Sequence, residues 1–338
     1  MGGIRWGVLS TASIARLVVE ATRQAERARF VAVASRDGAR ARGFADELGL
    51  GLRFGSYEEL LASDQVDAVY VPLPVSMHTD WTIRSLQAGK HVLCEKPFAT
   101  SPEDAARCFD AAEAAGRRCV EGLMWRHHPQ TTLARRLVDD GAIGRLAMVR
   151  AALSVHVEPG DIRRSADLGG GAVGDLGCYC VSAIRLFGGE PERVHAAQVR
   201  DGPGGVDLRL AATLELPGEV LAQLDIGLDL SRRDELELIG TEGRLTIPDP
   251  WLCRSDHLTL DRDGRGERIP VDPAGDLGLT DPDHDVYRIE LDTVSAAIAD
   301  GVELPFGRAD AVAQAATLRA LARSAEPATP VAPGRGYR

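Results

Sequence analysis

Strand-like and helix-like segments alternate over the first 123 residues, and this alternation constrains the fold more than any other feature of the chain. Short apolar runs that are typical of buried strands occur at 4–9, 30–34, 66–71, 91–94 and 118–121. Amphipathic stretches that are typical of helices separate them. Strands that alternate with helices in this way predict a parallel, doubly wound sheet. We therefore expect an α/β domain over residues 1–123.

Beyond residue 123 apolar and polar residues alternate with a period of two. Such segments lie at 146–155, 193–200, 207–216, 220–228, 235–239 and 244–247. Short glycine-bearing turns between them favour antiparallel neighbours. Helices are expected at 129–140, 172–187, 283–300 and 307–325, and a loose tail over the last dozen residues. The predicted fold class is α/β, with an N-terminal Rossmann domain (1–123) and a C-terminal α+β domain (124–338) that has a large open, mostly antiparallel sheet.

Composition excludes several classes of protein. The 50 acidic residues outnumber the 39 basic ones, which gives a net charge of −11 and disfavours a nucleic-acid partner. No apolar run approaches the roughly 18 residues of a membrane span, and the first residues lack the pattern of a secretory signal. We expect a cytoplasmic protein with no membrane partner. The six cysteines show no spacing typical of a zinc site, so we expect reduced thiols and no metal.

The turn after the first strand is a candidate phosphate loop. A strict G-x-G-x-x-G motif would need glycine where Ser10, Ala12 and Ala15 stand. These residues are small enough for a pyrophosphate to approach the backbone at a helix N-terminus. An ordinary tight strand–helix turn is the alternative interpretation. If the loop binds a cofactor, the contacts are expected from Ser10, Thr11, Ala12, Ser13 and Ile14.

The end of the second strand predicts which dinucleotide binds. NAD-specific sheets usually place an acidic side chain there to accept the ribose hydroxyls. This chain has Ser35 and Arg36, with Arg40 shortly after. A guanidinium suits a 2′-phosphate or stacks on adenine. A solvated helix start is the alternative, but given a Rossmann sheet these residues favour NADP over NAD.

Two motifs carry a family resemblance. Glu95-Lys96-Pro97 follows a sheet strand, where open α/β sheets bind ligands. Asp175 and Tyr179, after a glycine run, are four residues apart and share one helix face. With 72–74, His78 and 124–129, these motifs resemble the Gfo/Idh/MocA oxidoreductases over essentially the whole chain. They look closest to the subgroup with NADP-dependent xylose dehydrogenase and dimeric dihydrodiol dehydrogenase, although the phosphate loop departs from the family's glycines.

The resemblance implies that Lys96 and Tyr179 carry the chemistry and that Asp175 binds a substrate hydroxyl. Oxidation of an alcohol by hydride transfer needs a base for the hydroxyl proton, and reduction needs the matching acid. A free tyrosine has a pKa of about 10, which a nearby ammonium lowers. We therefore expect Tyr179 to be the proton donor or acceptor and Lys96 its electrostatic activator. In the alternative, Lys96 itself carries the proton and Asp175 tunes it.

Further contacts are expected around these residues. The additional cofactor-binding candidates are Pro72, Leu73, Pro74, His78, Glu95, Lys96, Pro97, Trp125 and Arg126. The substrate-binding candidates are Lys96, His156, Arg163, Asp175, Tyr179, His284 and Tyr287. For the members outside the two motifs, a structural role is an equal alternative.

These features predict an NADP(H)-dependent oxidoreductase that interconverts a hydroxyl and a carbonyl on a sugar, polyol or related diol. The open sheet of the second domain resembles the family's substrate-covering and oligomer surface, so a homodimer or homotetramer is expected. Two alternatives remain on the same fold: a non-catalytic cofactor-binding regulator, and a glycosidase that uses NAD transiently. Which sugar or diol reacts, and in which direction, does not follow from the sequence.

Overall fold

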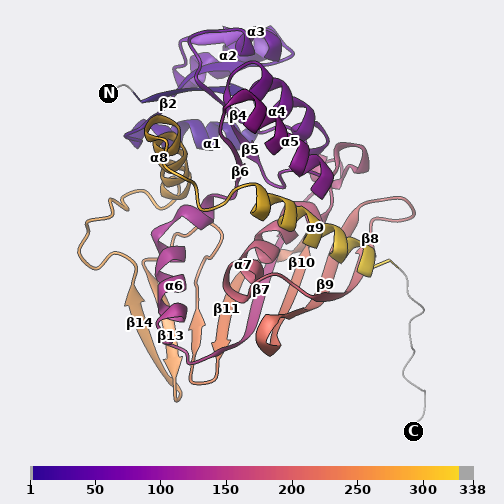
Figure 1. The fold of residues 1–338 in the computed structure, drawn as a ribbon. Helices are drawn as coiled ribbons and strands as arrows, with labels where there is room; N and C mark the ends of the chain where they lie inside the picture. The colour runs from indigo at the N-terminus through magenta and orange to yellow at the C-terminus, as the bar shows by residue number, and fades with distance from the viewer. Residues whose placement is uncertain (1–2, 327–338) are drawn as a thin grey trace.

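The computed structural model describes residues 3–326 and contains two sheets, one in each half of the chain (Figure 1). The first sheet has six parallel strands in the order β3-β2-β1-β4-β5-β6. The strands are β1 (Ile4–Leu9), β2 (Ala28–Ala34), β3 (Leu52–Phe54), β4 (Ala68–Val71), β5 (His91–Glu95) and β6 (Cys119–Gly122). This order is that of a Rossmann sheet, as predicted. No local pattern predicted β3, which is only three residues long.

Helices connect these strands and cover the sheet. They are α1 (Ser13–Ala21), α2 (Gly38–Leu48), α3 (Tyr57–Leu61), α4 (His78–Gln87) and α5 (Pro102–Ala115). Side chains begin three of them, because Asp37, Ser56 and Ser101 accept hydrogen bonds from first-turn backbone N–H groups. Helix α1 is different, since its N-cap Ala12 makes no such side-chain bond. Ala15 N donates to Ala12 O, and the N–H groups of Ser13 and Ile14 remain available to a ligand.

The second sheet has eight strands in the order β14-β13-β12-β11-β7-β10-β9-β8. The strands are β7 (Leu146–His156), β8 (Arg193–Arg200), β9 (Asp207–Leu216), β10 (Val220–Gly227), β11 (Asp229–Gly240), β12 (Arg244–Thr246), β13 (His257–Arg262) and β14 (Arg265–Pro270). All neighbours are antiparallel except β7 and β10, which pair in parallel. The mostly antiparallel sheet is confirmed, but the parallel pair means that it is not a simple meander.

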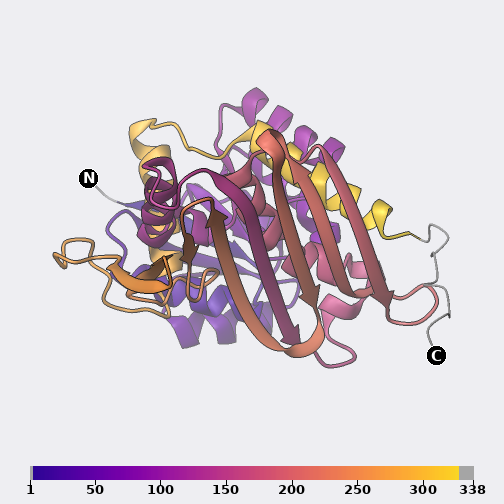
Figure 2. The same ribbon diagram turned by 90° about the horizontal axis from the view of Figure 1, so that it is seen from below.

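One face of this second sheet is covered and the other is open (Figure 2). Helix α7 (Cys178–Gly188) packs on β7 and β10, and α6 (Pro129–Asp139) lies towards β13. Alternate residues such as Leu210 and Leu238 turn to the covered face and are buried. The alternating polar residues of the same strands form the open face.

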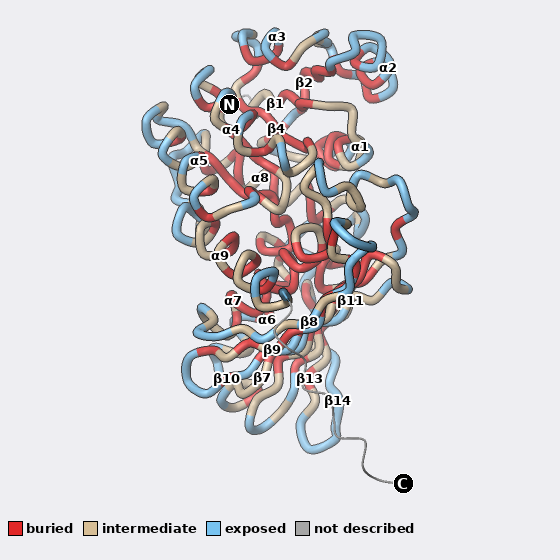
Figure 3. The backbone as a smooth tube through the Cα atoms, turned by 90° about the vertical axis from the view of Figure 1, so that its right-hand side faces the viewer, coloured by how far each residue is buried: buried red, intermediate tan, exposed pale blue. Residues whose placement is uncertain are grey.

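The last two helices return to the first half of the chain. Helix α8 (Asp285–Asp300) packs on α1, β1 and β2, and α9 (Arg308–Ser324) packs on α5, α7 and β8. The indole Nε1 of Trp6 in β1 donates to Ser295 Oγ at 3.0 Å. Buried residues from both halves form one continuous core, seen as the red segments in Figure 3.

None of the helices in residues 3–326 has the length and apolarity that a bilayer crossing needs. The expected C-terminal tail lies outside the described residues.

Candidate active site

The loop between β1 and α1 has the conformation that its motif position demands, although it lacks the glycines. Ser10 has a φ of 141°, a region that L side chains rarely adopt and that glycine tolerates. Its Oγ accepts a hydrogen bond from Ala12 N at 3.2 Å and donates one to Pro72 O at 3.2 Å. These bonds tie the loop to the end of β4. Ala12, Ser13 and Ile14 line a pocket, so the start of α1 is placed to meet an anion.

The end of β2 forms a separate polar region. Ser35 is buried, and its Oγ accepts from Asp37 N at 3.2 Å. The Asp37 carboxylate caps α2, accepting from Ala39 N at 2.8 Å and Arg40 N at 3.3 Å. Arg36 and Arg40 are exposed, and neither forms an ion pair with any residue of the described chain. The acidic group of this turn is thus used for capping, and neither guanidinium has a carboxylate partner in the described chain, although Arg36 lies close enough to Tyr57 to act on the pKa of its phenol.

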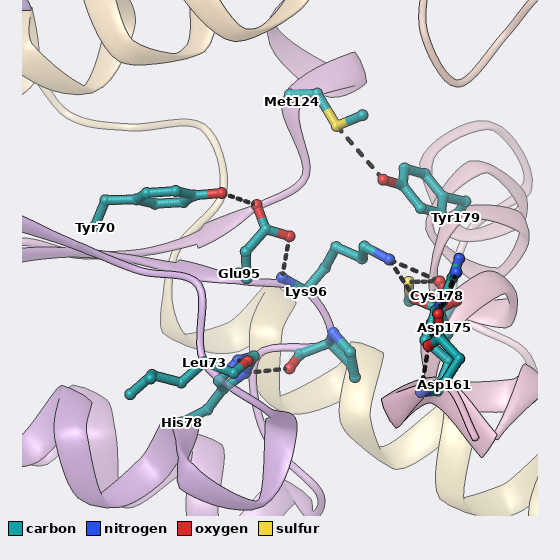
Figure 4. Close-up of polar contacts among 12 residues, drawn as sticks. Tyr70, Leu73, His78, Glu95, Lys96, Met124, Asp161, Asp175, Cys178 and Tyr179 are labelled. Carbon is teal, nitrogen blue, oxygen red and sulfur yellow. Dashed lines mark hydrogen bonds and ion pairs between the residues drawn. The ribbon is translucent and has the colours of Figure 1, made fainter. Parts of the chain in front are cut away.

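Lys96 lies directly after β5, in a loop that a buried histidine braces (Figure 4). The two ring nitrogens of His78 lie 2.7 Å from Leu73 O and 2.9 Å from Pro97 O. His78 therefore links the loops that follow β4 and β5. Burial lowers the pKa of its ring, so the imidazole is neutral and donates to one of these carbonyls at a time.

The Lys96 ammonium reaches across to the second half of the chain. Its Nζ donates to the carboxylate of Asp175 at 2.8 Å and to the backbone oxygen of the same residue at 2.9 Å. Asp175 lies in a single π-helical turn, Val173–Gly177, directly before α7. Such wide turns occur often at functional sites. Here the turn presents a carboxylate oxygen and the backbone oxygen of Asp175 to one ammonium.

Two close backbone approaches hold the Asp175 turn in place. Gly171 has a φ of 129°, and a Cβ there would lie 2.2 Å from Asp207 Oδ1. A Cβ on Gly170 would lie 2.4 Å from Arg163 O. The other carboxylate oxygen of Asp207, from β9, accepts from Val173 N at 2.6 Å. The glycine run therefore lets β9 cap the helix that carries Asp175 and Tyr179.

Tyr179 lies beside Lys96, with its ring near the ammonium and its hydroxyl bonded to another residue. The Lys96 Nζ is 5.0 Å from the centroid of the Tyr179 ring. The phenol donates to Met124 Sδ at 3.6 Å, and the ring packs against Trp251 with centroids 5.8 Å apart. Asp175 and Tyr179 thus both face Lys96, as their spacing predicts.

Burial decides the protonation of Tyr179. It raises the pKa of the Tyr179 phenol well above its ordinary value, and the Lys96 charge offsets this only in part. The ammonium acts to lower this pKa, as expected, but the net change is upward because desolvation, which the expectation left out, is the larger effect. Burial also acts to lower the pKa of Lys96, but Asp175 and other neighbouring groups outweigh it and raise that pKa well above the ordinary value. Both groups hold their protons.

Glu95 is turned away from Asp175. Its Oε1 accepts from the Tyr70 hydroxyl at 2.6 Å, and its Oε2 accepts from Lys96 N at 3.2 Å. Burial raises the pKa of this carboxyl, against the effect of Lys96. The residue therefore anchors the backbone of the Lys96 loop from the inside.

These segments enclose a pocket of about 390 Å³. It is lined by Ala12, Ser13, Ile14, Pro72, Leu73, Glu95, Lys96, Met124, Asp161, Ile162, Arg163, Asp175, Tyr179 and Tyr287. A smaller space of about 100 Å³ adjoins it, with Pro74, His78, Pro97 and Arg163 in its wall. Most of the predicted site residues therefore surround one cavity between the two sheets.

Nine predicted residues line neither space: Ser10 and Thr11 of the first loop, Ser35, Arg36 and Arg40 after β2, and the four described next. Trp125 is buried against Trp251, with ring centroids 5.8 Å apart. The Arg126 guanidinium binds Ser182 Oγ and Asp310 inside the junction between the sheets. His156 is largely exposed beside Glu158, and His284 Nδ1 lies 2.8 Å from Asp281 Oδ2. The second lysine, Lys90, also lies elsewhere and donates to the backbone oxygens of Ser63 and Val66.

The sequence analysis missed several pocket residues. Met124, Asp161 and Ile162 line the cavity, and Trp251 supports Tyr179 from behind. Met124 opens a segment that the family resemblance had already singled out. The others lie in loops whose path depends on tertiary packing, so no local pattern indicates them. Among residues 3–326 no group of three or more histidine, cysteine, aspartate or glutamate side chains could hold a metal ion.

Comparison with known proteins identifies the family. Residues 4–123 match the oxidoreductase family with an NAD-binding Rossmann fold, and residues 131–246 match the GFO/IDH/MocA C-terminal domain. D-xylose 1-dehydrogenase (NADP(+)) 2 of Haloferax volcanii is 38% identical over 95% of this chain and 97% of its own length. A dTDP-3,4-didehydro-2,6-dideoxy-α-D-glucose 3-reductase of Streptomyces violaceoruber is 40% identical over 79% of this chain and 80% of its own.

A solved structure agrees over almost the whole molecule. The 3-ketoreductase KijD10 of Actinomadura kijaniata, in complex with NADP and TDP-benzene, has a TM-score of 0.86 and 32% identity. The likeness covers 96% of this chain and 98% of that one. With both sheets matched and the Lys96, Asp175 and Tyr179 side chains gathered at their junction, the chain belongs to the Gfo/Idh/MocA family of oxidoreductases.

Proposed function

We propose that the protein is an NADP(H)-dependent oxidoreductase that interconverts a hydroxyl and a carbonyl of a sugar, polyol or related diol. The observation that carries this proposal is the Lys96–Asp175 pair beside Tyr179, in the wall of the pocket that the start of α1 also lines. In this proposal residues 1–123 bind the dinucleotide, whose nicotinamide exchanges a hydride with the substrate. Residues 124–338 supply Asp175, Tyr179 and the substrate surface.

The polar region after β2 supports NADP as the cofactor. A 2′-phosphate adds negative charge that guanidinium groups bind well. Arg36 and Arg40 are exposed there, and Asp37, which could otherwise serve a ribose hydroxyl, is occupied by the cap of α2. The named relatives point the same way, because the Haloferax enzyme uses NADP(+) and the KijD10 structure contains NADP.

Tyr179 is the proton carrier in this proposal, and Lys96 remains a cation. In reduction, a hydride adds to the carbonyl carbon while the proton on the Tyr179 hydroxyl moves to the carbonyl oxygen. The raised pKa of Tyr179 keeps that proton in place until charge develops on the substrate. Asp175 holds the proton on Lys96, so the lysine acts as a fixed positive charge that stabilises the developing alkoxide. Oxidation reverses these transfers.

The open face of the second sheet is the proposed contact of a homodimer or homotetramer. A groove of about 470 Å³ on this face is lined by small residues such as Ala152, Ala197 and Ala211. Charged groups such as Arg233 and Asp225 also line it and pair with each other. Light scattering of the purified protein tests this assignment, and a monomer at micromolar concentration would contradict it.

The central test is turnover of NADP+ and NAD+ with a panel of aldoses, polyols and trans-diols, followed by nicotinamide absorbance. The reverse reaction is measured with NADPH and the matching carbonyl compounds. We expect turnover with NADP(H) that Lys96→Met and Tyr179→Phe abolish. Tight dinucleotide binding without turnover in either direction would contradict the proposal and favour a regulator. Glycoside cleavage that needs NAD without net reduction would favour a glycosidase.

A further inference from the structure

We propose that the substrate is a neutral sugar or polyol and not a nucleoside-diphosphate sugar or other anionic sugar. This inference rests on the proposed function and names the substrate class of the same pocket. It rests on the ion pairs that the cations at the substrate end of the pocket form with neighbouring carboxylates.

Each cation that lines the pocket already has a carboxylate partner. Lys96 donates to Asp175 at 2.8 Å. Arg163 makes a two-pronged contact with Asp161, with Nε to Oδ1 at 3.0 Å and Nη2 to Oδ2 at 2.9 Å. The hydrogen bonds from Arg163 lower the pKa of Asp161, so this carboxylate keeps its charge. An anionic ligand would have to displace these internal partners.

The charge balance around Lys96 and Arg163 also disfavours an anion at the substrate end of the pocket, away from the start of α1. The lining contains two cationic side chains, Lys96 and Arg163, and three carboxyl groups. A diphosphate group would bring further negative charges close to Asp161 and Asp175, and like charges repel strongly where water is scarce. Sugar hydroxyls fit such paired groups, because each hydroxyl donates to a carboxylate oxygen and accepts from an ammonium or guanidinium.

Two arginines next to lining residues, Arg164 and Arg232, are paired in the same way. Arg164 follows Arg163 and bonds Asp201, with Nη2 to Oδ2 at 2.7 Å. Arg232 lies close enough to Tyr287 to lower its phenol pKa, which burial raises, and its Nε bonds Asp234 Oδ2 at 2.7 Å. No unpaired arginine on these segments is therefore positioned to receive a phosphate.

The separate polar region after β2 supplies the contrast. There, where the proposed 2′-phosphate binds, Arg36 and Arg40 are exposed without an ion-pair partner in the described chain. The relatives do not decide the question, because one is named a xylose dehydrogenase and another a dTDP-sugar reductase. The observation that separates neutral from anionic sugars is the pairing of Arg163 with Asp161 and of Lys96 with Asp175.

The first experiment compares chemically matched ligands with the NADP-loaded protein. Turnover is measured with glucose, xylose, glucose 6-phosphate and glucuronate, and inhibition by dTDP is measured with the best neutral substrate. We expect kcat/KM for the neutral sugars to exceed that for their anionic counterparts at least about tenfold, and we expect no inhibition by millimolar dTDP. Preferred turnover of an anionic sugar, or micromolar inhibition by dTDP, would overturn the inference.

A binding measurement separates this inference from the proposed function. Calorimetry with dTDP, glucose 6-phosphate and neutral sugars against the NADP-loaded protein requires no turnover. If no compound reacts, the proposed function fails, but binding of dTDP or of the phosphorylated sugar ahead of the neutral ones would still refute the neutral class. Binding of the neutral sugars alone would support it.

A charge variant tests the stated cause. Asp161→Asn removes the negative charge but keeps an oxygen that can accept from Arg163 N, as Asp161 Oδ1 does at 2.9 Å. We expect the preference for neutral over anionic sugars to fall about tenfold, because Arg163 becomes free to bind the anion. An unchanged preference would contradict the role assigned to this pair.

The matched control is Asp67→Asn. Asp67 makes the same two-pronged contact with Arg5, at 2.9 and 2.6 Å, and is about as exposed as Asp161. It directly precedes β4 and so lies at the amino-terminal end of this strand, whereas the pocket lies at the carboxyl ends of β4 and β5. We expect the preference of this variant for neutral over anionic sugars to equal that of the original protein.

Discussion

The turn after β2 and the loop after β7 both place aspartate and arginine close together in sequence but use them differently. After β2, Asp37 directly follows Arg36, yet its carboxylate turns to the N–H groups at the start of α2. In the loop after β7, Asp161 precedes Arg163 by two residues and binds both its backbone N–H and its guanidinium. One arrangement leaves a cation free for an anion, and the other neutralises it. The presence of arginine alone therefore does not indicate a phosphate site; its partner does.

The largest effect should come from the groups that carry the chemistry. Tyr179→Phe removes the proton carrier, and we expect kcat to fall about 10²–10⁴-fold while NADP affinity stays within about threefold. Lys96→Met should cause a loss of similar size, because the developing charge on substrate loses its cation. Steady-state rates and NADP titration measure both. Retained turnover in Tyr179→Phe with loss in Lys96→Met would instead favour the lysine as the proton carrier.

The other lysine provides the control for this prediction. Lys90 is buried and donates to the backbone oxygens of Ser63 and Val66. Lys90→Met leaves these acceptors unpaired, and we expect it to cost about 1–3 kcal/mol of unfolding free energy without changing kcat. A large loss of turnover in this variant at a temperature where it remains folded would show that lysine replacement alone does not report on the site.

A buried carboxyl in the junction between the sheets should produce a pH dependence of stability. Glu121 Oε1 accepts from Phe98 N at 3.1 Å, but its Oε2 has no partner, and the nearby Arg126 and Arg185 both bind Asp310. Burial raises the pKa of Glu121 to about 7. The folded protein therefore binds this proton more tightly than the unfolded chain does. Here the arginines are paired and it is the carboxyl that lacks its counter-ion.

The sign follows from linkage. Because the folded pKa is raised, the contribution of Glu121 is fully present below about pH 4.5 and is lost as the pH rises through about 7. Glu121→Gln keeps an acceptor for Phe98 N and removes this proton. Relative to the original protein, we expect the variant to gain up to about 3 kcal/mol between these pH values. Denaturant unfolding across the pH range measures it; parallel stability curves for the two proteins would contradict the prediction.

The free arginines after β2 should affect cofactor choice. We expect Arg36→Ala and Arg40→Ala each to raise KM for NADP about 10-fold to 100-fold and to leave KM for NAD nearly unchanged, since a charge-assisted hydrogen bond contributes about 1.5–3 kcal/mol. Arg135→Ala is the control, because this exposed arginine on α6 is paired with Asp139. An equal loss for NAD and NADP would mean that these side chains do not contact the 2′-phosphate.

Patterns local in sequence predicted most of the architecture. Five strands of the α/β half and the helix over 283–300 were predicted from apolar periodicity and are found as β1, β2, β4, β5, β6 and α8. The hairpin of β13 and β14 was missed because β14 is mostly exposed and has no apolar alternation. The parallel pairing of β7 with β10 was also not predicted. These strands are far apart in the sequence, and their pairing depends on how helix α7, which comes between them in the chain, packs on the sheet.

The site was predictable where motifs carry it and not where contacts between distant segments decide. Lys96, Asp175 and Tyr179 were found through their motifs. Asp207, which caps the helix that carries Asp175 and Tyr179, comes from a strand more than thirty residues later. The pKa of Tyr179 depends on burial, which no sequence pattern reports. Sequence therefore indicated which side chains meet, whereas the structure determined their protonation and their partners.

The smallest effect is expected in the phosphate loop, where strain and hydrogen bonding oppose each other. Ser10 holds a φ of 141°, which costs about 1–3 kcal/mol for a residue with a Cβ. The two hydrogen bonds of its Oγ, with Pro72 O and Ala12 N, are both 3.2 Å long, and each offsets that cost by about 1 kcal/mol. Ser10→Gly removes both terms, so we expect its unfolding free energy to change by less than about 1 kcal/mol.

Ser10→Ala separates the two contributions, because it keeps the strain and loses both bonds. We expect it to be less stable than Ser10→Gly by about 1–3 kcal/mol, which is the cost of the Cβ in this conformation. Denaturant unfolding of both variants measures the difference. If the alanine variant were as stable as the glycine variant, the loop would tolerate a Cβ without strain. The serine would then be retained for its hydroxyl alone, and the absence of the family's glycines would carry no conformational cost.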